Sequence, residues 1–184
     1  MAEETKTLAD FCAWLRYEDL PREVVEMTKA CLLDWLGSAI GGSCLAPARI
    51  VAGIVDKLGG VPESTIVNRS GKTSCVNAAL ANGAMSHILE LDDVHRESLL
   101  HPAAAVIPAA LAVAEKQNAD GRVLLTAIVA GYEAAVRVGE AVGPSHYSIW
   151  HNTATCGTFG AAVAAGKVLR LDPKRMANAL GSAG

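Results

Sequence analysis

The spacing of hydrophobic residues predicts a chain built almost entirely of helices. Apolar residues recur every three or four positions from Leu8 onward, which is typical of amphipathic helices. Only Ser64 to Val67 has the character of a short extended segment. The fold class is therefore all-α with minimal strand content. The predicted helices span residues 8–17, 21–40, 46–58, 75–89, 103–117, 123–142 and 154–169, with a last helix beginning at Asp172-Pro173.

Capping and breaking residues support these boundaries. Ser74 and Asp120 precede two of the helices and are favourable N-cap residues. Pro102 suits a first helical position, whereas Pro108 should kink the same helix or mark its true start. Gly143-Pro144 should end the helix that begins near Val123.

The second helix carries a broad apolar stripe and should be buried, ending at Gly41-Gly42. The stripe comprises Val24, Val25, Thr28, Cys31, Leu32, Trp35, Leu36, Ala39 and Ile40.

Composition indicates that much of the surface is intended for burial. Hydrophobic residues make up 51% of the 184 residues, charged residues only 19% and aromatic residues 4%. Such a chain favours closely packed helices and a large interface. We expect one incomplete helical domain over residues 1–184, which either forms a homodimer or packs against a missing C-terminal portion of the same protein.

Charge and hydropathy exclude several classes of partner. The net charge is −3 and no run of Lys or Arg occurs, so neither nucleic acid nor a membrane is expected as a partner. No apolar run reaches the roughly 18 residues needed to span a bilayer, and the acidic start is unlike a signal peptide. We expect a cytoplasmic protein. The five scattered cysteines indicate neither disulfides nor zinc, and should be buried as small apolar residues.

Candidate chemistry is concentrated between His87 and His101. Three of the five histidines lie there with several carboxylates, while the flanking segments are almost entirely small or apolar. Titratable groups set in an apolar frame favour a functional site, although a solvated loop between helices is the alternative. The expected helix would place His87 and Glu90 on one face of its last turn.

A metal site is one hypothesis for this segment. Asp92, Asp93 and His95 could bind Mg, Mn or Fe. Arg96, however, places a cation where an Asp-Asp-x-x-Asp motif needs its last ligand, and no second Asp-rich motif occurs. A metal-dependent enzyme is therefore the weaker alternative, and no metal or cofactor is expected.

Two histidines directly precede predicted helices. His101 and His151 each lie at a helix start, where free N–H groups and the helix dipole favour an anion such as a carboxylate substrate. The same dipole favours a neutral imidazole that can accept a proton. The alternative for each histidine is a purely structural helix cap.

These motifs together resemble the MmgE/PrpD family. The resemblance rests on His87-x-x-Glu90-Leu91-Asp92-Asp93-x-His95 with His101-Pro102, then Gly131-Tyr132-Glu133, then His151-x-Thr153-x-Thr155-x-Gly157-Thr158-Phe159-Gly160. It runs from about Leu8 to Gly184 and implies the front of a large helical domain. Members of the family include 2-methylcitrate dehydratase, cis-aconitate decarboxylase and iminodisuccinate epimerase.

The resemblance implies a catalytic set of Glu90, His101 and His151. Glu90 departs from the more common Asp, which would shift the carboxylate by one methylene. It further implies substrate binding or support from Asp92, Asp93, His95, Arg96 and Thr153.

The implied activity is that of a lyase or isomerase that abstracts a proton next to a carboxylate of a small di- or tricarboxylic acid, most like 2-methylcitrate dehydratase. The alternative is a non-catalytic helical module that dimerises or binds a carboxylate. Family members also use downstream groups outside these residues, so a chain of this length is expected to hold only part of the site.

Overall fold

The computed structural model describes residues 3–184 and confirms the all-α prediction. Within these residues the chain forms helices joined by short connections and one two-stranded antiparallel sheet, in which Ser64 pairs with Thr73. The elements are α1 (Glu3–Trp14), η1 (Tyr17–Asp19), α2 (Arg22–Ser43), α3 (Ala46–Leu58), β1 (Ser64–Thr65), β2 (Lys72–Thr73), α4 (Cys75–His87), α5 (Pro102–Gln117), α6 (Gly121–Tyr147), α7 (Asn152–Val168) and α8 (Pro173–Ala183).

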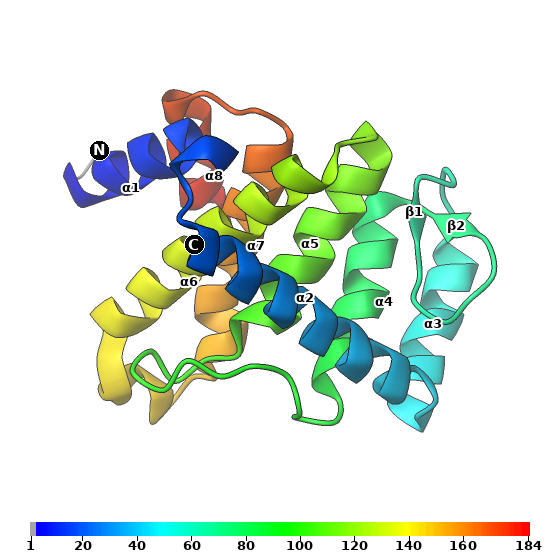
Figure 1. The fold of residues 1–184 in the computed structure, drawn as a ribbon. Coiled ribbons are helices and arrows are strands. Elements are labelled where there is room, and N and C mark those ends of the chain that lie inside the picture. Colours follow the sequence, from blue (N-terminus) through cyan, green and yellow to red (C-terminus); the bar gives the residue numbers. More distant parts are fainter. Residues whose placement is uncertain (1–2) are drawn as a thin grey trace.

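Helices α5, α6 and α7 form the centre of the molecule (Figure 1). Their close approach depends on small residues. A Cβ added to Gly160 on α7 would lie 2.7 Å from the carbonyl oxygen of Gly131 on α6, closer than real Cβ atoms come to other atoms. Because no side chain separates the two backbones here, α6 and α7 pack tightly, and this packing fixes the position of one helix relative to the other.

Two smaller clusters extend this centre at opposite ends. At one end α1 packs against α8, with Cys12 and Met176 fully buried between them and the central helices. At the other end α3, α4 and the sheet form a third cluster, in which the Asn82 amide accepts a hydrogen bond from the Val67 N–H and donates one to the Thr65 carbonyl. Figure 1 shows α2 crossing the face between these ends.

The predicted end of α2 at Gly41-Gly42 is slightly early: the helix continues to Ser43. The glycine at position 42 is explained by a contact with α4. A Cβ on Gly42 would overlap the carbonyl oxygen of Met85, so this glycine allows two backbones to touch and does not stop the helix.

The predicted burial of the whole α2 stripe is only partly correct. Trp35 and Ala39 are fully buried, whereas Leu36 and Ile40 are 38% and 49% exposed. Other large apolar side chains of α2 and α3 are also exposed, namely Met27, Leu33, Ile50, Ile54 and Leu58. Over residues 3–184 no single helix is long and apolar enough to cross a membrane; only α2 and α3 taken together, bent by 88°, pass that test by length and composition.

Three further expectations are refined by the structure. Pro108 lies inside a helix that starts at Pro102, so it does not mark the helix start. Gly143 breaks α6 with a φ of 63°, as predicted, but a last helical segment follows as far as Tyr147. All five cysteines are free; Cys12 and Cys156 are buried as expected, whereas Cys44 is exposed at the end of α2, so burial does not hold for every cysteine.

Candidate active site

The loop between α4 and α5 lies against the start of α7, which brings the polar segment between His87 and His101 next to the helix start that carries His151. The His101 N–H donates to the Thr153 hydroxyl over 3.0 Å, and the buried Asn152 amide donates to the Ser98 carbonyl over 2.8 Å. The loop also rests on α6 at Gly139, where an added Cβ would lie 2.7 Å from the Ser98 Cβ. A glycine at this position therefore lets the loop approach the helix.

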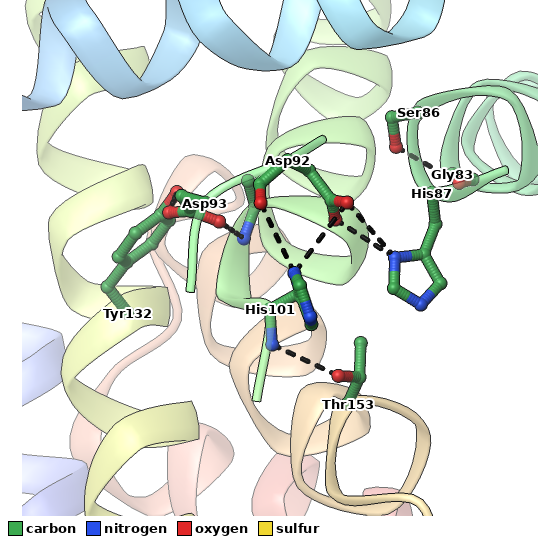
Figure 2. Close-up of polar contacts among 9 residues, drawn as sticks. Gly83, Ser86, His87, Asp92, Asp93, His101, Tyr132 and Thr153 are labelled. Atoms are coloured by element: carbon green, nitrogen blue, oxygen red, sulfur yellow. Dashed lines mark hydrogen bonds and ion pairs between the residues drawn. The ribbon is translucent and has the colours of Figure 1, made fainter. Parts of the chain in front are cut away.

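Asp92 is the buried carboxylate of the site. Its oxygens lie 3.0 and 3.2 Å from His87 Nδ1, and one lies 3.6 Å from His101 Nδ1 (Figure 2). The carboxylate is fully buried, whereas the His87 and His101 side chains are 27% and 25% exposed. The hydrogen bond that His87 donates to the Asp92 carboxylate raises the pKa of His87, which burial alone would lower.

His101 is held in one tautomer by the backbone. Its Nδ1 lies 3.2 Å from the carbonyl oxygen of Asp92. Because a carbonyl oxygen only accepts hydrogen bonds, Nδ1 must carry the hydrogen. The neutral ring then presents Nε2 with a free lone pair, which is the form required of a general base.

Asp93 connects the loop to two helices. One oxygen accepts the N–H of Ala103 in the first turn of α5 over 3.0 Å, and the other accepts the Tyr132 hydroxyl of α6 over 2.7 Å. Burial raises the pKa of both Asp93 and Tyr132, so the tyrosine hydroxyl stays protonated and is the donor. Asp93 thus caps α5 from outside the helix.

His151 lies at the start of α7 and faces the same cluster. Its ring centroid is 5.8 Å from that of His87 in a stacked arrangement, and the His87 centroid is 5.1 Å from that of His101. His87 is therefore the shared neighbour of both histidines. The sequence motif contains His87, but the expected catalytic set omits it; its position on the last turn before a carboxylate-rich loop was the available signal.

Glu90 is placed outside this hydrogen-bonded cluster. Helix α4 ends at His87, and Glu90 follows in a turn with a left-handed φ of 48°, where its N–H donates to the His87 carbonyl. The expected shared helical face is therefore not formed. Glu90 is exposed, although its charge contributes to raising the pKa of His87.

His95 and Arg96 lie on the outer part of the loop. His95 Nδ1 is 2.8 Å from the Ser98 hydroxyl and Nε2 is 3.6 Å from Glu97, while Arg96 is exposed. Neither residue is brought to the His87, Asp92 and His101 cluster.

The ligand set expected for a metal does not assemble. Asp93 is bonded to Ala103 and Tyr132, and His95 faces Ser98 and Glu97, so the two do not join Asp92 around one point. A different set, His87, Asp92 and His101, brings one ligand atom from each residue within 4.8 Å of the others. Two imidazoles and a carboxylate are ligands that can bind zinc.

Comparison with known proteins confirms the resemblance to the MmgE/PrpD family. Residues 6–184 match the model of the MmgE/PrpD N-terminal domain. The cis-aconitate decarboxylase of Aspergillus terreus (strain NIH 2624 / FGSC A1156) is 33% identical over 186 residues, covering 95% of this chain and 38% of the relative. The cis-aconitate decarboxylase-like protein oryM of Aspergillus oryzae is 31% identical, covering 98% of this chain and 40% of the relative.

The chain thus spans about two fifths of the length of these curated relatives. The family match extends from the first helix to the last residue and includes both histidine-bearing helix starts. The chain belongs to the MmgE/PrpD family.

Proposed function

We propose that the chain carries one part of the active site of a lyase that acts on a small di- or tricarboxylic acid. The observation that carries this proposal is the convergence of His87, Asp92, His101 and His151 from helix ends that are far apart in sequence. Imidazoles around a carboxylate can exchange protons with a carbon acid and bind its carboxylates.

The proposed chemistry centres on His101. In a dehydration, Nε2 removes the proton from the carbon next to a carboxylate, the C–H electron pair forms the double bond, and the hydroxyl group leaves as water after taking a proton from a second, protonated histidine of the cluster. In a decarboxylation, the carbon–carbon bond to the leaving carboxylate breaks, carbon dioxide departs, and a protonated histidine returns a proton to the remaining carbon. Both reactions require a proton carrier beside a carboxylate-binding region.

The relatives and the sequence motifs favour different first substrates. The motif resemblance favours a 2-methylcitrate dehydratase-like reaction, whereas the named fungal relatives are cis-aconitate decarboxylases. At about one third identity, a relative's name supports the reaction class more than the substrate. We therefore propose cis-aconitate and 2-methylcitrate as the two substrates to be tested first.

The test is an assay of the full-length polypeptide that contains these residues. Carbon dioxide release from cis-aconitate and loss of water from 2-methylcitrate are measured separately for the wild type, His101→Ala and the control His146→Ala. His146 bonds to Thr155 and lies outside the cluster. Turnover that His101→Ala removes and His146→Ala retains would support the proposal. Carboxylate binding without turnover of either acid would favour the binding module instead.

A further inference from the structure

The contacts around the Asp92–Asp93 peptide link His101 to a residue on α6. Asp92 supplies the carbonyl that accepts from His101 Nδ1, and Asp93 is the next residue in the chain. The two are joined by one planar peptide unit, so restraining Asp93 also restrains the direction of the Asp92 carbonyl. Figure 2 shows Asp93 between Tyr132 and the start of α5, with Asp92 turned toward His101 and His87.

The Asp93 side chain is anchored at both of its oxygens. Tyr132 holds one oxygen over 2.7 Å and the Ala103 N–H holds the other over 3.0 Å. The two anchors belong to different helices, α6 and α5, which pack directly against each other. A carboxylate bonded in this way has little freedom to rotate, and the peptide before it is correspondingly restrained.

We propose that Tyr132 and Asp93 are positioning residues that hold the Asp92 carbonyl against His101 and so keep its Nε2 free to act as the base. Neither residue needs to contact a ligand for this role. The catalytic consequence rests on the proposed function, whereas the effect on the His101 tautomer does not.

The alternative is that the Tyr132–Asp93 pair only stabilises the packing of α5 on α6. That role would change thermal stability in a variant but would leave the protonation pattern of the His101 ring unaltered. The Asp92 carboxylate, 3.6 Å from His101 Nδ1, could hold the same tautomer without help from Asp93. An experiment must therefore measure directly which nitrogen of the His101 ring carries the hydrogen.

The experiment is nitrogen NMR of the histidine rings at neutral pH in the full-length polypeptide, with His101 assigned from a His101→Gln variant. In the wild type, His101 is expected to show a protonated Nδ1 and an unprotonated Nε2 with widely separated shifts. In Tyr132→Phe and Asp93→Asn the two shifts should move toward each other as the tautomers exchange. Tyr17→Phe is the matched control, because Tyr17 lies in η1 beneath Arg122, remote from the loop.

Turnover gives the second readout. If the proposed lyase activity is found, Tyr132→Phe should lower kcat roughly 3- to 10-fold, the effect of one hydrogen bond that acts on the base indirectly, with KM unchanged. Unaltered His101 shifts in both Tyr132→Phe and Asp93→Asn would overturn the positioning role, even if stability falls. A shift change without any measurable turnover would retain the positioning role and overturn only the proposed function.

Discussion

The starts of α5 and α7 look alike in sequence but differ in how their histidines are held. His101 has both its backbone N–H and its ring Nδ1 in hydrogen bonds and is only a quarter exposed. His151 is exposed, and its ring lies beside those of His87 and Tyr147. Its carbonyl, in contrast, accepts the N–H groups of Ala154 and Thr155.

This difference separates two ways of holding a histidine at a helix start. The His101 ring is oriented before any ligand arrives, because the loop fixes its tautomer and the start of α7 fixes its backbone. Among residues 3–184 the His151 ring has ring contacts with His87 and Tyr147 but no hydrogen bond, so its side-chain rotamer can adjust to a ligand. Substitution of His101 should therefore affect both stability and turnover, whereas substitution of His151 should affect turnover alone.

The largest effect is expected for His101→Ala. Loss of a positioned general base typically lowers the rate by roughly 10²- to 10⁴-fold, so turnover of whichever proposed acid proves to be a substrate should fall by a factor in that range. The measurement is kcat/KM on the full-length polypeptide beside His146→Ala, whose fold should be equally intact by circular dichroism. Retention of more than about a tenth of the activity would show that His101 is not the base.

Thr153→Val should have the largest effect on stability. Valine has a similar shape but cannot accept the His101 N–H, which would lose its partner at the junction of the two helix starts. We expect the free energy of unfolding to fall by about 1–3 kcal/mol in urea denaturation. The control is Thr158→Val, whose exposed hydroxyl bonds only within α7. Equal losses in both variants would mean that the junction contributes nothing specific.

Asp92→Asn should remove a pH-dependent part of the stability. The pKa of His87 is raised in the folded state above its ordinary value of 6.5, mainly by the hydrogen bond to Asp92. This contribution is therefore complete below the unfolded pKa and is lost as the pH rises through the folded pKa. The difference in unfolding free energy between wild type and variant should shrink by about 1 kcal/mol from acidic to mildly alkaline pH, given the partly exposed ring. A constant difference would contradict the assignment.

The helices could be predicted from the sequence because their causes are local. Ser74 and Asp120 cap α4 and α6 as expected, with side chains that accept the N–H groups of Asn77 and Val123. The segment containing the site could be predicted for the same reason, because the polar residues stand out within an apolar stretch. The predicted end of α2 is wrong because Gly42 is needed for a close backbone contact with Met85 on α4, and it does not end the helix.

The pairing of residues within the site could not be predicted from the pattern. Thr153 lies 52 positions from His101, and Tyr132 lies 39 positions from Asp93, so these bonds depend on how α5, α6 and α7 pack. The sequence predicts Glu90 on the same helix face as His87, whereas in the structure Asp92 is the carboxylate that bonds to His87. This arrangement depends on a left-handed turn at Glu90, a conformation that glutamate rarely adopts and that the sequence does not indicate.

The smallest effect on stability is expected for His151→Ala. The ring is exposed, no hydrogen bond from it is found among residues 3–184, and the backbone contacts that start α7 do not involve it. We therefore expect the free energy of unfolding to change by no more than about 0.5 kcal/mol, while His101→Ala loses more because its ring bond to the Asp92 carbonyl disappears. Turnover should nevertheless fall strongly in both. A large stability loss in His151→Ala would mean that this ring is also held in place, and would remove the distinction between the two helix starts.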